Sequence, residues 1–430
     1  MLNFFLINSG KFISFVSRFL NLGSGSTWPG EIALSINPNF IKKSIEKNNL
    51  KIILIAGTNG KTTTALLLQS ILSNNGYNVF QNTAGANLLN GIASSLISNS
   101  DLSGKINKDF AIFEIDENTL PLILKEISNP NFIIILNLFR DQLDRYGEVN
   151  TIAKKWKDAL KHLDEKTTLI LNADDPQVAF LGNILKAKVL YFGLNPTGNR
   201  NDKIQHASDS TYCPKCQTKL NYNSTYFSHL GDWNCAKCGY SHPKITFTSF
   251  SFYPLLGVYN RYNTNAAVLL AKDLRLNDEK ISSALKNFKP AFGRQEILIF
   301  NSKQVQIFLS KNPTGLNESL KTIVNLKAEN LLLVLNDRIP DGRDVSWIWD
   351  VDFENFATVF KNIMISGDRV FDMGLRLKYA GFKNFQTEEN LTKAVNVALG
   401  KTAKDEVLYI FPTYSAMLEV RKILTGKKIL

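Results

Sequence analysis

Short apolar runs alternate with amphipathic stretches over most of the chain after Leu50. The runs KIILIAG (51–57), FAIFEID (110–116) and NFIIILNL (131–138) are continuous enough to be strands that are buried on both faces. Helical patterns stand between them, for example TTTALLLQSILSNNG (62–76), which ends at a glycine. This alternation predicts an α/β fold in which helices cover a mostly parallel sheet.

The alternation is interrupted at residues 205–245, which are polar, rich in turn residues and contain all four cysteines. It then resumes, and a second series of strands begins with VQIFLS (305–310). We therefore predict an N-terminal helix and loop (1–37), a central domain (38–297) that carries an insert, and a smaller C-terminal α/β domain (298–430).

The first residues, MLNFFLINSGKFISFVSRFLNLG, carry only the charges of Lys11 and Arg18. They lack the early positive charge and the cleavage site of a secretory signal, and no run in the chain is long enough to span a bilayer. We predict an amphipathic helix packed on the protein, with contact to the inner membrane surface as the alternative. The following GSGSTWPG (23–30) is typical of a loop.

The chain has 50 Lys and Arg against 38 Asp and Glu, a net charge of +12. This excess is compatible with an anionic partner such as a nucleotide, a nucleic acid or a membrane face. It is equally compatible with a general bias of the composition toward Lys, Asn and Ile. Charge alone therefore does not choose between these partners.

The stretch GTNGKTT (57–63) stands where a predicted strand turns into a helix. Small residues there allow backbone N–H groups to close on phosphate oxygens, and the helix dipole adds positive potential. Lys61 can reach the outer phosphates, and the Thr62 hydroxyl can ligate Mg²⁺. The residues predicted to bind the nucleotide here are Gly57, Thr58, Asn59, Gly60, Lys61, Thr62 and Thr63.

The general phosphate-loop pattern would place glycine at position 55, where this chain has Ile55. The shorter form found here resembles the Mur ligases and folylpolyglutamate synthetases, which make amide bonds through an acyl phosphate. The resemblance implies Mg²⁺ on Thr62 and Glu114. It also implies that Asn260 and Asn263 face the adenine of ATP.

Two further segments fit this resemblance. FGRQE supplies Arg294 to the nucleotide site, as similar segments do in Mur ligases. In NLFRDQLDRYGE (137–148), Gln142 stands where the family usually has a metal-binding histidine, so a second Mg²⁺ site there is not implied. A carbamylated lysine, used by some Mur ligases, is left open among three candidates. These are Lys154, Lys155 and Lys157.

A carboxylate attacks the γ-phosphate of ATP only if the charge on both partners is neutralised. A lysine and a Mg²⁺ ion can do this together. We therefore assign catalytic roles to Lys61 and Glu114.

Two Cys-x-x-Cys pairs, CPKC and CAKC, are separated by eighteen residues. This spacing is typical of a zinc ribbon, in which four thiolates hold Zn²⁺ tetrahedrally and close the site. We predict a structural zinc ion. Its ligands would be Cys213, Cys216, Cys235 and Cys238.

The ribbon together with LNDRIPDGRDVSWIWDVDFE (335–354) resembles the MurT family. That resemblance implies a ligase that uses ATP, Mg²⁺ and Zn²⁺ in the cytoplasm, with the inner membrane face as an alternative location. The substrate would be the D-glutamate α-carboxylate of lipid II, and a glutaminase subunit of the GatD type would supply ammonia. An aspartate of the signature would complete the partner's Cys–His pair. We assign this role to Asp344, with Asp341 and Asp350 as alternatives.

Two other functions remain open at this point. An amino-acid-adding ligase of the Mur or folate type would need no glutaminase. A nucleic-acid-binding ATPase would interleave basic and aromatic residues on the ribbon, and the motifs above do not favour it. The four histidines and four cysteines form no recognisable nucleophile motif, so an amide nitrogen taken from glutamine would come from another chain. The histidines are His162, His206, His229 and His242.

Overall fold

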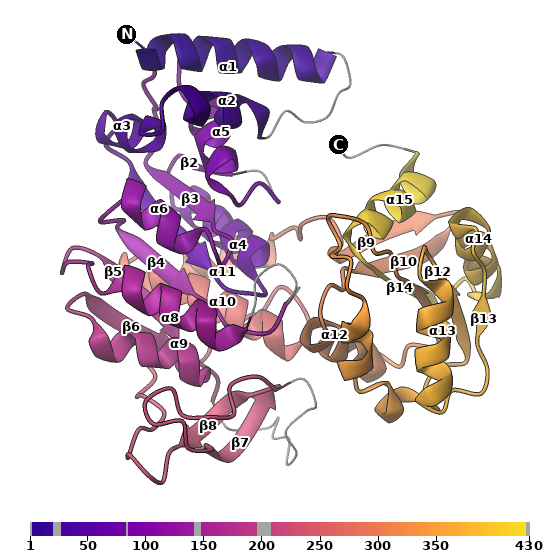
Figure 1. Ribbon diagram of the computed structural model, residues 1–430. Coiled ribbons are helices and arrows are strands. Elements are labelled where there is room, and N and C mark those ends of the chain that lie inside the picture. Colours follow the sequence, from indigo (N-terminus) through magenta and orange to yellow (C-terminus); the bar gives the residue numbers. More distant parts are fainter. Residues whose placement is uncertain (1, 20–26, 83–84, 142–147, 196–207, 427–430) are drawn as a thin grey trace.

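The computed structural model describes residues 2–19, 27–82, 85–141, 148–195 and 208–426. Two α/β units stand side by side, with the N-terminal helices at one end of the first unit and a small hairpin at its other end (Figure 1). Each unit is built around its own sheet. The α/β class, the parallel sheet and the smaller second α/β unit are as predicted, and the fold class is confirmed.

The first sheet has six described strands in the order β2-β3-β1-β4-β5-β6, and all of its pairs are parallel. Alternate residues of the central strand β1 enter two different cores, with Ile53 and Ile55 on one face and Ile52 and Leu54 on the other. Burial on both faces explains the continuous apolar runs. The strands are β1 (Lys51–Ala56), β2 (Val79–Gln81), β3 (Phe110–Glu114), β4 (Phe132–Ile135), β5 (Thr168–Asn172) and β6 (Lys188–Phe192).

Helices cover both faces of this sheet, and each group shares a core with it. One face packs against α4 (Lys61–Asn74), α10 (Val258–Asp273) and α11 (Asp278–Lys286). The other face packs against a larger group. It contains α5 (Leu89–Asn99), α6 (Leu120–Glu126), α8 (Val149–Leu160), α9 (Pro176–Leu181) and the short η1 (Gly182–Ile184) nearby.

Three N-terminal helices lie on α5: α1 (Leu2–Phe19), α2 (Trp28–Ile36) and α3 (Phe40–Glu46). Leu6 and Ile7 of α1 are buried, so the predicted packing of this helix on the protein is observed. The loop predicted at 23–30 is wrong in its last three residues, which form the first turn of α2. Proline is accepted there because the first turn needs no N–H from it. No described helix is long and apolar enough to cross a membrane.

The second sheet has the described order β13-β12-β11-β14-β10-β9, with β9 antiparallel to β10 at the edge. Its strands are β9 (Arg294–Phe300), β10 (Lys303–Phe308), β11 (Asn330–Val334), β12 (Asn362–Ser366), β13 (Gln386–Thr387) and β14 (Val407–Pro412). The predicted boundary between residues 297 and 298 lies inside β9. Its side chains alternate between partly exposed and exposed, and this weak pattern does not distinguish the strand from a linker.

Helices also cover both faces of the second sheet. One core contains α12 (Pro313–Asn325), α13 (Val370–Tyr379), η2 (Ser346–Asp350) and η3 (Phe353–Phe356). The opposite core contains α14 (Leu391–Lys401) and α15 (Tyr414–Thr425). The insert forms the hairpin of β7 (Asn221–Phe227) and β8 (Leu230–Asn234), which packs around the fully buried Trp233.

Candidate active site

The glycine loop follows β1 and ends at the N-terminus of α4. Gly57 and Gly60 have φ angles of 136° and 92°, which favour glycine. A Cβ atom on Gly60 would lie 2.0 Å from Asn263 Oδ1, so any other residue would have to displace the Asn263 side chain. Asn137 fixes the loop from β4: Asn59 N donates to its Oδ1 at 2.8 Å, and its Nδ2 donates to Asn59 O at 3.0 Å.

The Lys61 ammonium group is folded back on this loop. It donates to the carbonyl oxygen of Gly57 and lies 3.4 Å from Glu117 Oε2, with both side chains buried. Burial alone would raise the pKa of Glu117, but the ammonium groups of Lys61 and Lys311 outweigh burial and lower it. The predicted phosphate-binding cation is therefore present in the site and is paired with a carboxylate.

Glu114 stands at the end of β3, beside the glycine loop. Thr62 Oγ1 donates to Glu114 Oε2 at 2.8 Å, which brings together the two residues predicted to hold Mg²⁺. Glu114 is 3% exposed, and its Oε1 has no hydrogen-bond partner. Burial raises the pKa of this carboxyl group. A buried carboxylate oxygen without a partner, next to a hydroxyl, fits the oxygen ligands that Mg²⁺ prefers.

The second α/β unit brings another lysine to the same place. Lys311 forms an ion pair with Asp141, which follows β4 in the first unit. Burial raises the pKa of Asp141, whereas the carboxylates of Asp141 and Glu117 overcome burial and raise the pKa of Lys311. Sequence reasoning did not assign roles to these three residues. Their positions directly after predicted strands were the available signal, because the carboxyl ends of parallel strands meet at one edge of a sheet.

A second contact between the units lies directly on the glycine loop. Asn312 Nδ2 donates to Asn59 Oδ1 at 3.0 Å. Asn312 is also the cap of α12, where its Oδ1 accepts from Gly315 N at 2.8 Å. The start of α12 is therefore attached to the loop that is predicted to bind phosphate.

Asn260, Asn263 and Arg294 line one cavity together with Gly60 and Thr63, so the structure brings together the residues predicted to hold ATP. The cavity measures about 60 Å³. Pockets for molecules of this kind usually have roughly 300–1,000 Å³. In the described arrangement this cavity is therefore narrow, and we refer to this arrangement of the two units as closed.

Arg294 lines this cavity and also interacts electrostatically with Glu114. Burial lowers its pKa, and the Glu114 carboxylate opposes that effect. The same attraction offsets part of the effect of burial on the pKa of Glu114, which stays raised. The guanidinium group, which comes from β9 of the second unit, therefore sits in the electrostatic field of the predicted magnesium ligand.

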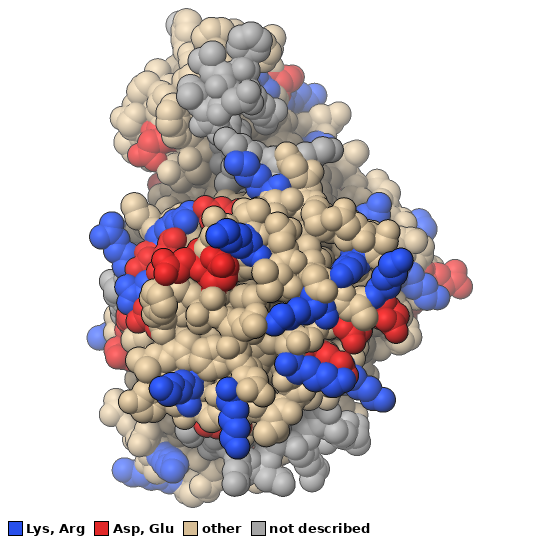
Figure 2. All heavy atoms as spheres, turned by 90° about the vertical axis from the view of Figure 1, so that its right-hand side faces the viewer, with Lys and Arg blue, Asp and Glu red and all other residues tan. Residues whose placement is uncertain are grey.

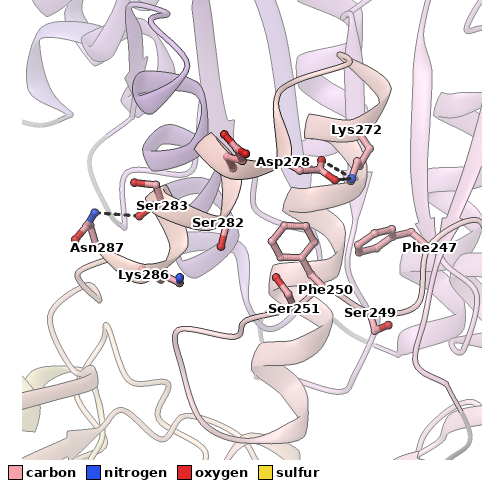
Figure 3. A pocket seen from close by; sticks show the side chains of 11 residues that line it. Phe247, Ser249, Phe250, Ser251, Lys272, Asp278, Ser282, Ser283, Lys286 and Asn287 are labelled. Carbon is pink, nitrogen blue, oxygen red and sulfur yellow. Dashed lines mark hydrogen bonds and ion pairs between the residues drawn. The ribbon is translucent and has the colours of Figure 1, made fainter.

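A larger hollow lies elsewhere, between α10, α11 and residues 247–251 (Figure 3). It measures about 950 Å³, but its described lining includes no residue of the glycine loop. Lys272 and Asp278 at its rim form an ion pair with each other. Volume alone does not locate the chemistry here.

The three candidate aspartates of the signature have different surroundings. Asp341 is buried and accepts hydrogen bonds from the backbone N–H and the hydroxyl of Ser415. Asp350 forms an ion pair of 3.1 Å with Arg140. Asp344 is exposed, and hydrogen bonds from the side chain and backbone of Ser346 lower its pKa. Asp344 is thus ionised and directed to the surface.

The four cysteine sulfur atoms lie within 4.8 Å of one another. Two Sγ–Sγ distances are 3.6 and 3.4 Å. A zinc ion with Zn–S bonds of about 2.3 Å requires sulfur atoms roughly 3.8 Å apart, so the cluster fits zinc. Burial raises the pKa of Cys213 to about 12, whereas hydrogen bonds with Thr218 lower the pKa of Cys216 to about 6.

Residues 55–271 match the family model of the Mur ligase middle domain, and residues 309–417 match the MurT ligase C-terminal domain. The MurT subunit of lipid II isoglutaminyl synthase (glutamine-hydrolyzing) from Staphylococcus aureus (strain COL) is 33% identical over 374 residues, covering 83% of each chain. This chain belongs to the MurT family. The predicted resemblance is confirmed, and with it the assignment to a family of ATP-dependent ligases.

A second MurT subunit, from Streptococcus pneumoniae (strain ATCC BAA-255 / R6), is 32% identical over 95% of this chain and 94% of its own. Among solved structures, a pseudomurein peptide ligase type C from Methanothermus fervidus has a TM-score of 0.63 at 24% identity. It covers 87% of this chain and 78% of that chain. This likeness shows that the MurT-family chain shares the Mur ligase fold.

The remaining predicted positions lie outside the described residues or at the surface. Gln142 and His206 lie outside the described residues. The candidate carbamylated lysines of α8 are all exposed. Lys155 Nζ donates to Asn118 Oδ1 at 3.0 Å, and Lys157 lies over the ring of Phe180.

We predict that Glu114→Gln stabilises the protein without Mg²⁺ and abolishes the stabilisation by Mg²⁺ and ATP. Burial raises the pKa of Glu114 in the folded protein. The wild-type free energy of unfolding therefore falls as the pH rises above the ordinary pKa of glutamate, because the buried group must then lose its proton. Glutamine does not ionise, so the variant does not show this fall in stability. Thermal melting from pH 4 to 8 measures both effects, with the exposed Glu389→Gln as control. A variant that keeps the full Mg²⁺-dependent rise in Tm would contradict the assignment.

We also predict about one zinc per chain after purification without chelators, and close to none in Cys235→Ser. Loss of the metal should expose the ribbon to proteolysis, because four thiolates hold its two ends together. Metal analysis and limited digestion test this, with Lys237→Ala between the cysteines as the matched control. A metal-free wild-type ribbon that resists digestion would overturn the zinc assignment.

Proposed function

We propose that this chain uses ATP to activate the α-carboxylate of D-glutamate in the stem peptide of lipid II. Ammonia from a separate glutaminase subunit of the GatD type then converts this group to the amide of D-isoglutamine. The observation that carries the proposal is the match of residues 309–417 to the MurT ligase C-terminal domain, because the match to the Mur ligase middle domain does not separate this chain from amino-acid-adding Mur ligases. Both MurT relatives are named as subunits of a glutamine-hydrolyzing synthase.

The chemistry takes two steps. A carboxylate oxygen attacks the γ-phosphorus of ATP, which gives an acyl phosphate and ADP. The ammonia nitrogen then attacks the acyl carbon, the C–O bond to phosphate breaks, and the amide, phosphate and a proton are released. Lys61 and Lys311, from the two units, supply positive charge to the transferring phosphoryl group.

Thr62 and Glu114 are the residues that would hold Mg²⁺. The ion would neutralise charge on the phosphates when it is bound. Glu117 and Asp141 hold the two lysines in place before the nucleotide arrives. The N–H groups of the first turn of α4 would be available to the phosphate oxygens, whereas those of Thr58 and Asn59 donate to Asn137.

Asp344 is proposed to orient the histidine of the glutaminase Cys–His pair across the interface, as the third member does in other triads. Its exposure and lowered pKa suit an anionic role at a surface. Asp341 accepts hydrogen bonds from Ser415, and Asp350 forms an ion pair with Arg140. Both aspartates are therefore less suitable than Asp344 for binding the partner's histidine.

We predict that Asp344→Asn lowers glutamine hydrolysis by the complex roughly 10³–10⁴-fold, because an amide cannot stabilise the imidazolium. Amidation with ammonium chloride as nitrogen donor should remain. Liquid chromatography of glutamate and amidated product measures both reactions, and Asp405→Asn, on the same unit and equally exposed, is the control. Unchanged glutamine hydrolysis would reject the role of Asp344. ATP turnover driven by an added amino acid without glutaminase would favour an amino-acid-adding ligase instead.

Nucleic acid has no part in this proposal. Trp233 of the ribbon is fully buried, so it cannot stack on a base. Figure 2 shows that basic and acidic side chains are interspersed on the outer face of the second unit, without a continuous basic patch there.

The acceptor is attached to a lipid, and we propose that α1 rests on the inner face of the membrane. Phe12 and Phe15 of α1 are 67% and 66% exposed, and Phe4 and Phe5 are exposed beside them. The helix contains no acidic residue. An exposed aromatic face with basic flanks is typical of helices that lie in the lipid interface.

We predict that the double variant Phe12→Ser, Phe15→Ser loses binding to vesicles that contain anionic lipid while its melting temperature changes little, because both rings are largely exposed. Vesicle flotation measures the bound fraction. Phe371→Ser, which removes an equally exposed ring from α13, is the matched control. Equal binding by wild type and the double variant would reject this surface.

A further inference from the structure

Arg140 is the one described residue whose side chain forms ion pairs with both the segment that leads into the ribbon and the second α/β unit. Its backbone N and its Nε donate to Asp209 at 2.9 and 2.5 Å, and its Nη1 donates to Asp350 Oδ2 at 3.1 Å. Asp209 is nearly inaccessible, whereas Arg140 and Asp350 are partly exposed. One guanidinium group therefore holds three segments that are far apart in the sequence.

The short segment that contains Arg140 also touches the nucleotide site at both of its ends. At one end, Asn137 holds the glycine loop through Asn59. At the other end, Asp141 pairs with Lys311 of the second unit. A change in the relative position of the two units would therefore displace this segment, because it contacts both the glycine loop and the second unit.

Asp350 ends the five-residue helix η2, and Asp344 lies just before its start, where Ser346 binds it. Arg376 holds the same helix from inside the second unit, since it donates to Ile348 O at 3.1 Å and to Val351 O at 2.5 Å. Because η2 is short and is held by Arg376, a displacement of Asp350 would also displace Asp344.

We infer that Arg140 is a positioning residue that couples the nucleotide site to the glutaminase. When the units close, the Arg140–Asp350 pair holds η2 so that Asp344 is correctly placed for the partner's histidine. This inference rests on the proposed function. A half-exposed ion pair contributes little to stability, so the value of the contact lies in its geometry. The planar guanidinium group binds both carboxylates at fixed angles, which a lysine cannot do.

The test uses the complex of the full chain with its glutaminase and compares two nitrogen donors, glutamine and ammonium chloride. In Arg140→Ala, glutamine-dependent amidation should fall roughly tenfold or more, as for a displaced positioning group. Ammonium-dependent amidation should stay within about twofold, because ammonia bypasses the glutaminase. The stimulation of glutamine hydrolysis by ATP and acceptor should be lost as well.

Asp350→Asn provides the second variant, since it leaves the Arg140–Asp209 contact intact and should reproduce the selective loss. Arg140→Lys should recover only part of the glutamine-dependent rate. Arg338→Ala, which removes exposed ion pairs to Asp368 and Glu419, is the control.

Two results would overturn the inference. An equal loss with both nitrogen donors would place Arg140 in the ATP chemistry or in the fold. If neither Arg140→Ala nor Asp350→Asn lowered glutamine-dependent amidation, the Arg140–Asp350 contact would have no part in the coupling. A wild-type complex that fails to amidate with ammonium chloride would instead contradict the proposed function, so the two failures are distinguishable.

Discussion

The site depends on the pairing of two lysines, one from each α/β unit, with two buried carboxylates; Lys61 is buried and Lys311 is half-buried. Lys61 faces Glu117, and Lys311 faces Asp141. An unpaired ion costs several kcal/mol when it is removed from water, so each lysine needs a negative partner in the closed arrangement. The phosphates of ATP are the natural replacement for these carboxylates. The same charges can therefore hold the two units together at the site and receive the nucleotide.

Under the proposed function, this arrangement would make the contact between the two units part of the chemistry. Lys311, Asn312 and Arg294 all belong to the second unit, yet they reach the glycine loop or the field of Glu114. The second unit also carries Asp344 on its surface. Activation of the carboxylate and supply of ammonia would thus depend on the same relative position of the units. In the proposed reaction, coupling of the two steps would avoid the loss of free ammonia and of the reactive acyl phosphate.

Local sequence patterns predicted the buried strands, the glycine loop and the four-cysteine cluster, since each depends on residues close in the chain. They did not predict β9, because an edge strand with partly exposed side chains lacks a clear periodicity. They also missed the roles of Glu117, Asp141 and Lys311, whose pairing joins residues far apart in the sequence. Such contacts are decided by the packing of one unit on the other. The catalytic and metal-binding roles of the predicted residues remain predictions.

Transfer of oxygen from the acceptor to phosphate tests the central claim most directly. A D-glutamyl lipid precursor labelled with ¹⁸O in its α-carboxylate is incubated with the chain, its glutaminase, Mg²⁺, ATP and glutamine, and the released phosphate is analysed by mass spectrometry. Activation through an acyl phosphate predicts one ¹⁸O atom in phosphate for every amide formed, and neither product with Lys61→Ala. Amide formation with unlabelled phosphate would contradict the account.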